Sequence, residues 1–312
     1  MGIELERKWM DLVLTRFQAF AKARGFRFVR NKNLQADMEK PVDQIPNDDR
    51  HELMIRFYDL CWRVSANGGR IVKCCNGIAC PKCLKVGFNQ LKRELKRGEN
   101  LLPRMSRRTE KLDAFDAMDM VWGVRHFHLG STPDLKHPGL ISGTEEIAYV
   151  FLPPAGKYAY IIDIDKHGRW TDERILEKLD DNFPEALTPY KINGCELSYE
   201  VTGDERQRIR ELCLNSPTRI KDFVIYSPYG GVSTAGTNTI AFGEFQHDRE
   251  IIRQQEDLVL ATLKNPPYSL DEMQLGKLIL VDFCLKRCPW VELKDEANGK
   301  VYGNRPNGMS AR

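Results

Sequence analysis

The sequence has no long apolar run and no apolar segment near its first residue. The opening MGIELERKWM is charged, and the longest run without a charge, residues 223–243, is rich in Gly, Ser, Thr and Asn. Membrane-spanning helices need a long apolar stretch, and secretory signals place a shorter one behind a basic start. We therefore expect a cytoplasmic protein with no membrane contact.

Several common enzyme motifs are also missing. The Gly-rich segment 227–238 matches neither the phosphate-binding P-loop nor the G-x-G-x-x-G pattern, which disfavours a nucleotide site. No G-x-S-x-G or H-E-x-x-H motif occurs, so serine-hydrolase and zinc-protease interpretations are disfavoured as well. The Gly-rich segment predicts a tight hairpin instead.

Overall charge is nearly balanced, but its distribution is not. The chain has 47 Lys and Arg against 44 Asp and Glu, a net charge of +3. Residues 70–111 hold 12 of the basic residues and 3 of the acidic ones, which is +9 for this basic segment and −6 for the rest. A segregated positive charge favours a polyanion such as RNA or another nucleic acid as partner, although a solvated helix face is the structural alternative. The candidate nucleic-acid-binding residues of this segment are Lys92, Arg93, Lys96, Arg97, Arg104, Arg107 and Arg108.

The apolar pattern predicts an α+β fold. We expect a helical N-terminal region over 1–111, a central antiparallel β-meander covered by helices over 112–190, and a mixed α/β C-terminal region over 191–312. The expected helices include 3–24, 86–97, 204–214 and 244–263, and the meander strands are 121–129, 146–152 and 158–164. The capping-box pattern of Ser269 and Glu272 predicts a last helix toward Lys286.

The cysteines gather in one short stretch. Four of the 9 cysteines are Cys74, Cys75, Cys80 and Cys83, and the last two form a C-x-x-C turn that can place two thiolates on one zinc ion. A second pair at the usual spacing is missing. A structural zinc held by Cys75, Cys80, Cys83 and a distant residue therefore stays open beside ordinary reduced thiols.

Three of the 6 histidines lie on or beside the predicted meander. His126 and His128 are two residues apart on a strand, so they project from one face while Arg125 faces the other way. They could be general acid and base for cleaving a phosphodiester through the 2′-hydroxyl, with Arg125, Lys166 or Arg169 stabilising the phosphate charge. They could also bind a metal ion together with His167 and an aspartate, or simply pack in the core.

The middle of the chain resembles a known family of enzymes. The basic helical lead-in is followed by the strands W-G-V-R-H-F-H-L, E-I-A-Y-V-F-L and Y-A-Y-I-I-D-I-D-K-H. Over residues 85–185 this arrangement is similar to the core of RelE/ParE-like toxin ribonucleases. The resemblance implies an RNA site lined by Arg125, His126, His128, Lys166 and His167, with Trp170 stacking on a base.

The leading hypothesis from the sequence is thus a toxin-like, metal-independent endoribonuclease of the kind found in bacterial or phage defence, acting on RNA without a cofactor. One alternative is a metal-dependent hydrolase or nuclease with an H-x-H metal site. Another is a non-catalytic factor that binds nucleic acid or protein, and a protein regulator of the chain is left open.

Overall fold

The structure is a computed structural model that describes residues 3–64, 68–114, 116–154, 156–265, 270, 278–285, 290–296 and 299–303. Helices and several small sheets alternate along the chain, which confirms the predicted α+β class. The chain divides into two compact units. The first combines residues 1–25, 31–58 and 243–312, and the second combines residues 26–30 and 59–242. Each unit therefore draws on more than one of the three predicted regions.

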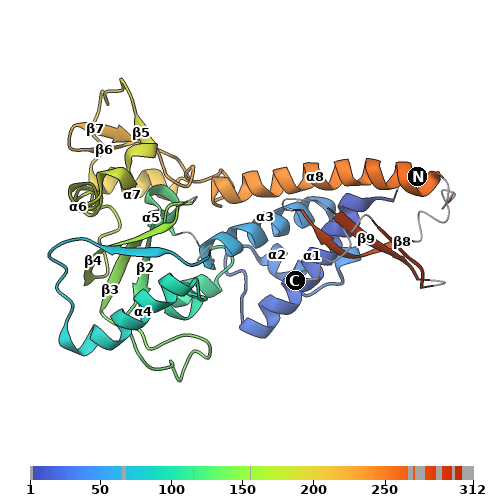
Figure 1. Ribbon diagram of the computed structural model, residues 1–312, viewed down its shortest axis with the longest axis horizontal. Coiled ribbons are helices and arrows are strands. Elements are labelled where there is room, and N and C mark those ends of the chain that lie inside the picture. Colours follow the sequence, from blue (N-terminus) through green and yellow to red (C-terminus); the bar gives the residue numbers. More distant parts are fainter. Residues whose placement is uncertain are drawn as a thin grey trace. The chain divides into compact units, whose positions relative to one another are not determined.

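The second unit is built on a sheet of four strands in the order β1-β4-β3-β2. Strands β2 (Val124–His128), β3 (Glu146–Phe151) and β4 (Tyr158–Lys166) run antiparallel to their neighbours, and Figure 1 draws them side by side in green. The predicted meander is therefore confirmed. Strand β1 (Ile71–Cys74) adds in parallel to the outer edge of β4, a pairing that the sequence pattern did not predict.

The first meander strand begins later than the sequence predicts. Residues Ala117–Trp122 form the short helix α5, which Asp116 caps by accepting a hydrogen bond from the backbone N–H of Asp119. Gly123 follows with φ of +67°, a left-handed conformation that glycine adopts without strain and that commonly ends a helix. The polypeptide becomes extended only at Val124, so Val121 and Trp122 belong to the helix rather than to the strand.

Each face of this sheet has a buried apolar part. On one face, Tyr149, Phe151 and Ile162 pack with the apolar side of helix α6 (Arg174–Asn182). On the other face Phe127 and Val150 are also fully buried. Helix α4 (Lys85–Arg97) reaches the end of β2 at Gly87, where a Cβ atom would lie 1.8 Å from the carbonyl oxygen of Leu129. Burial on both faces fixes the register of the strands that carry the histidines.

Smaller elements complete the second unit. A three-stranded sheet has the order β5-β7-β6, with β5 at Lys191–Ile192, β6 at Thr218–Ile220 and β7 at Phe223–Ile225. Helix α7 (Gly203–Glu211) begins with a capping box formed by Thr202 and Glu205. In the Gly-rich segment, Val232 and Asn238 form an isolated antiparallel bridge, as expected for a tight turn.

The first unit consists of helices and a small sheet. Its elements are α1 (Leu5–Arg24), α2 (Lys32–Asp37), the first part of α3 (Asn47–Val64), most of α8 (Thr239–Lys264), β8 (Leu278–Cys284), β9 (Trp290–Asp295) and β10 (Val301–Gly303). Trp9 of α1 stacks on Phe245 of α8 with ring centroids 6.1 Å apart. The carboxylate of Glu256 accepts hydrogen bonds from the backbone N–H groups of Glu4 and Leu5, which satisfies donors at the start of α1.

The predicted last helix is wrong over Leu278–Cys284. These residues form strand β8, which pairs antiparallel with β9, and their Leu, Ile, Val and Phe content suits a strand. Ser269, Glu272 and Lys286, which define the predicted helix, lie outside the described residues. Among the described helices, none is long and apolar enough to span a membrane.

Candidate active site

Two histidines of β2 share a face with acidic residues of β4. His126 lies opposite Tyr149 of β3, which in turn lies opposite Asp163 of β4. The next row consists of His128, Ile147 and Asp165. Because directly opposed residues project from the same face, one side of the sheet end carries two imidazoles and two carboxylates.

A β-bulge on β4 creates these rows. The register shifts between Tyr149 and Val150, which pair with Asp163 and Ile161. Ile162 is therefore the extra residue on β4, and in a regular register without the bulge Ile162 itself would stand opposite Tyr149. Bulges often redirect side chains next to functional sites.

The loop after β4 brings two further rings to the same place. The ring of His167 lies 5.9 Å from that of His126 and 5.2 Å from that of His128, between centroids. The ring of Trp170 lies 5.0 Å from that of His126. We call His126, His128, His167 and Trp170 the histidine cluster. His167 is exposed and the other three are half-buried, so the cluster is open to solvent on one side.

The hydrogen bonds of His128 fix which of its nitrogens carries the proton. The backbone N–H of Thr144 donates to Nδ1 over 3.0 Å. A nitrogen that accepts a hydrogen bond has no proton of its own, so the neutral ring carries its proton on Nε2. Burial lowers the pKa of His128 to about 4, and the charges of His167 and His126 add to this. At neutral pH His128 is therefore an uncharged ring with an Nε2–H donor.

His126 has the opposite arrangement. Its Nδ1 lies 3.5 Å from a carboxylate oxygen of Asp116, the residue that also caps α5. A carboxylate beside Nδ1 favours the tautomer with the proton on Nδ1 and leaves the Nε2 lone pair available. Burial lowers the pKa of His126, while Asp116 acts to raise it. His126 is thus a neutral imidazole whose Nε2 can accept a proton.

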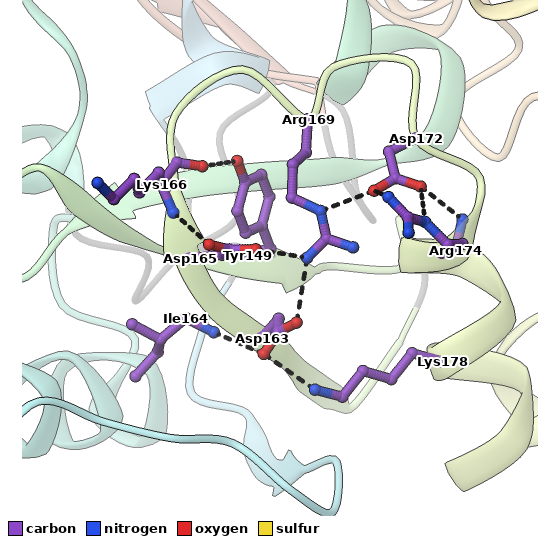
Figure 2. Close-up of polar contacts among 9 residues, drawn as sticks. All are labelled: Tyr149, Asp163, Ile164, Asp165, Lys166, Arg169, Asp172, Arg174 and Lys178. Carbon is purple, nitrogen blue, oxygen red and sulfur yellow. Dashed lines mark hydrogen bonds and ion pairs between the residues drawn. The ribbon is translucent and has the colours of Figure 1, made fainter.

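Arg169 holds the loop that carries His167 and Trp170. Its guanidinium contacts Asp163 at 3.1 Å, Asp165 at 3.0 Å and Asp172 at 2.8 Å. Figure 2 shows this side chain directed toward all three carboxylates from the loop above β4. Lys178 of α6 reaches Asp163 at 2.9 Å. These contacts neutralise the aspartates and fix the loop, so Arg169 supports the site rather than offering a free positive charge.

Two arginines of the basic segment act on the histidines. Arg107 and Arg108 begin the short 3-10 helix Arg107–Glu110 and are exposed. The charge of Arg108 contributes to the lowered pKa of His126, after burial and His167. Arg107 contributes in the same direction at His128, although it also pairs with Asp134 at 3.1 Å. No salt bridge of Arg108 occurs among the described residues, so no neighbouring carboxylate is seen to neutralise its charge there.

Arg104, another predicted nucleic-acid-binding residue, is structural. Its side chain is only 3% exposed and forms an ion pair with Glu94. It also donates to the carbonyl oxygens of His128 and Gly130, each over 3.2 Å. The other predicted residues, Lys92, Arg93, Lys96 and Arg97, lie on α4, where Lys92 is half-buried and the remaining three are exposed.

Two of the predicted catalytic residues do not join the cluster. Arg125 points to the opposite face of β2, as the alternation predicts, and its side chain is 3% exposed. It pairs with Asp119 at 3.0 Å and donates to the carbonyl oxygen of Trp62 over 2.7 Å. Lys166 pairs at 2.7 Å with Glu145, and both side chains are about two-thirds exposed. Arg125 therefore lies on the face opposite the histidine cluster, and Lys166 takes part in an exposed ion pair.

The cysteines do not converge on a common point in the described structure. Cys75 is buried against α6, and its Sγ donates to the carbonyl oxygen of Lys178. Cys74 and Cys83 are exposed, and Cys80 is half-buried. Burial raises the pKa of Cys75 to about 11, which favours its thiol form. Among the described residues, no group of three His, Cys, Asp or Glu side chains is arranged to hold a metal ion.

Three contributors to the site escaped the sequence analysis. The sequence patterns gave no role to Asp116 or Thr144, and they indicated Arg169 only as a candidate cation. The Asp116 to Asp119 spacing is an N-cap signal that could have placed a helix start beside the histidine strand. No protein-family model, curated protein sequence or solved structure matches the chain, so the site is interpreted from its own geometry.

Proposed function

We propose that the histidine cluster is the catalytic centre of a metal-independent endoribonuclease. The observation that carries this proposal is the contrast between the two imidazoles of β2. His126 has Nδ1 beside Asp116, whereas Nδ1 of His128 accepts from a backbone N–H. One ring is suited to accept a proton through Nε2, and the other is suited to donate a hydrogen bond through Nε2.

These properties match the steps of RNA cleavage by its own 2′-hydroxyl. His126 removes the proton from the 2′-hydroxyl, and the 2′-oxygen attacks the adjacent phosphorus. The bond from phosphorus to the 5′-oxygen breaks, its electron pair moves to that oxygen, and His167 delivers a proton there. The products are a 2′,3′-cyclic phosphate and a 5′-hydroxyl end.

The remaining groups stabilise charge and hold the strand. In this proposal the Nε2–H of His128 and the guanidinium of Arg108 stabilise the negative charge that develops on the non-bridging phosphate oxygens. A neutral histidine that acts as a hydrogen-bond donor is an established catalytic arrangement. Trp170 offers a ring on which an unpaired base can stack. The resemblance to toxin ribonucleases is compatible with these roles, and control by a protein regulator stays a prediction.

The metal-dependent alternative requires a different arrangement of His128. A histidine ligand uses one ring nitrogen for the metal and usually donates its other N–H to an acceptor. At His128 the other nitrogen, Nδ1, faces the N–H donor of Thr144 instead. Binding of a metal at Nε2 would place two N–H groups against each other, so the observed hydrogen bond favours the metal-independent mechanism.

The test is cleavage of a short fluorescent single-stranded RNA by the purified full chain in the presence of a chelator. We expect cleavage with a 2′,3′-cyclic phosphate product. The same oligonucleotide with 2′-deoxyribose throughout should stay intact because it lacks the attacking hydroxyl. Cleavage of the deoxy substrate, or cleavage that needs an added metal ion, would contradict the proposal in favour of a metal-dependent nuclease. Binding without cleavage would favour the non-catalytic alternative.

A further inference from the structure

A cavity of about 610 Å³ lies beside the end of β2, outside the histidine cluster. One wall is α4, which contributes Gln90, Arg93 and Arg97, and the other is the loop between β2 and β3, which contributes residues 131–133 and 139–141. This volume is within the usual range for small-molecule sites. The cavity is therefore large enough for one nucleotide.

The cavity is held open by its own hydrogen bonds. The β2–β3 loop folds back on itself through the bridge between Pro133 and Ile141, and the N–H of Ile141 donates to the carbonyl oxygen of Pro103 over 2.8 Å. Gly130 permits a close approach, because a Cβ atom there would lie 2.1 Å from the carbonyl oxygen of Ser142. The loop is thus a built wall, and a ligand would meet a preformed site.

The charged groups of the cavity favour an anion. The carboxylate of Glu94 is bound on both oxygens by Arg104, so its negative charge is neutralised inside the wall. Arg93 is exposed and has no ion pair among the residues that the structure describes, whereas Arg97 pairs at 3.3 Å with Glu99, an exposed acidic residue that also lines the cavity. These two guanidinium groups lie one helical turn apart on the same side of α4. A phosphate group at the rim would meet both.

The polar and apolar lining also suits a base. The Oε1 atom of Gln90 accepts from Arg104 over 3.2 Å, which leaves the amide NH₂ group of Gln90 to donate to a base oxygen or nitrogen. Pro103, Pro133 and Leu140 supply apolar surface. Phosphate-binding guanidinium groups, an amide donor and apolar walls together correspond to the parts of a nucleotide.

The cavity and the histidine cluster are joined through His128. Arg104 in the cavity wall binds the carbonyl oxygen of His128, whose imidazole belongs to the cluster. Arg107 and Arg108 follow Arg104 in the sequence, and their charges act on His128 and His126, respectively. We infer that this cavity, which we call the flanking subsite, binds the next nucleotide of the RNA strand, beyond the two nucleotides that the cleaved phosphate joins. This inference rests on the proposed function and specifies how the enzyme holds its substrate.

The experiment compares two double variants of equal charge. Arg93→Ser/Arg97→Ser changes the flanking subsite, and Lys82→Ser/Lys85→Ser removes two exposed charges elsewhere in the basic segment. Binding of a fluorescent oligoribonucleotide with 2′-O-methyl groups, which cannot be cleaved, is measured by anisotropy at several salt concentrations. Cleavage of the unmodified oligonucleotide and of a dinucleotide is measured in parallel.

We expect the arginine variant to weaken oligonucleotide binding by about tenfold. The slope of the logarithm of the binding constant against the logarithm of the salt concentration should become shallower by about 0.7 for each lost phosphate contact. The lysine variant should bind within about twofold of the unchanged protein. Cleavage of the dinucleotide should depend on Arg93 and Arg97 less than cleavage of the longer oligonucleotide does, because a dinucleotide ends before the flanking subsite. Thermal unfolding of each variant serves to check that the fold persists.

The two proposals fail differently in this experiment. Equal binding by the arginine and lysine variants would overturn the flanking subsite, whether or not RNA is cleaved. Arginine-dependent binding without any RNA cleavage would support the flanking subsite and overturn the proposed endoribonuclease. Absence of oligonucleotide binding by the unchanged protein would overturn both.

Discussion

The two faces of β2 carry ionisable side chains from consecutive residues, yet they place them in very different surroundings. On one face, Arg125 is buried with Asp119 and a backbone carbonyl. On the other, His126 and His128 border a solvent-open cluster with His167 and Trp170. The first face satisfies its charge completely and so contributes to stability. The second leaves nitrogens available and so can contribute to chemistry.

The largest expected difference between the two faces is in activity. His126→Ala removes the proposed base, and general-base catalysis is typically worth about 100-fold to 10,000-fold. RNA cleavage should fall by that factor while the chain still folds, because Nδ1 of His126 lies 3.5 Å from Asp116 and forms no hydrogen bond among the described residues. Single-turnover cleavage and urea unfolding measure the two quantities. A loss of activity matched by a loss of folding would instead make His126 structural.

Substitutions on the Arg125 face of β2 should change the free energy of unfolding. Asp119→Asn leaves Arg125 buried without its carboxylate, which typically costs about 3–5 kcal/mol. The matched control is Glu145→Gln, which breaks the exposed pair with Lys166 and should cost less than about 1 kcal/mol. Urea unfolding compares the two variants. An equal loss of unfolding free energy in Asp119→Asn and Glu145→Gln would mean that the buried Arg125 pair contributes no more to stability than an exposed pair.

The loop that completes the cluster depends on Arg169. Arg169→Ala removes its contacts with three aspartates and should displace His167 and Trp170, so that cleavage falls by about tenfold to a hundredfold. Arg169 is a positioning residue, so Arg169→Lys, which keeps a cation near Asp163, should restore part of the rate. Arg174→Ala is the control because Arg174 also binds Asp172 but is 78% exposed. Equal activity in all of these variants would remove Arg169 from the account.

The histidine face should also make stability depend on pH. The pKa of His128 is lowered from 6.5 to about 4 in the folded state, so the unfolded chain binds more protons between these values. Stability should therefore fall as the pH drops through this window and be unaffected by His128 above it. In His128→Asn, the side-chain oxygen can still accept from Thr144, and the slope in this window should be smaller. An unchanged slope would show that His128 is not the group responsible.

Local patterns were enough to predict much of the fold. Alternation in R-H-F-H predicted that His126 and His128 share one face of the strand and that Arg125 lies on the other. Helical periodicity predicted α1, α4 and α8. Strand β1 was missed because it pairs with β4 about 90 residues later, and such a partner leaves no local signal. Strand β8 was mistaken for a helix because a capping-box pattern preceded an apolar run that fits either element.

The candidate site was predictable only in part for the same reason. The three histidines could be grouped from their places on predicted strands. The bulge at Tyr149 and Val150, the bond from Thr144 to His128 and the approach of Asp116 to His126 depend on tertiary packing. Arg104 and Arg125 looked like free cations because a sequence shows charge but not burial. The contacts of Asp116 with His126 and of Thr144 with His128 are the ones that distinguish the proposed base from the proposed hydrogen-bond donor.

The most direct test of this account is the protonation of His126 and His128, observed by long-range ¹H–¹⁵N correlation of the imidazoles during a pH titration. Single substitutions of each histidine assign the signals. The account predicts a proton on Nε2 of His128 with neutrality retained down to about pH 4, and a proton on Nδ1 of His126. A proton on Nδ1 of His128, or the same tautomer in both rings, would contradict the assignment of one ring as base and the other as donor.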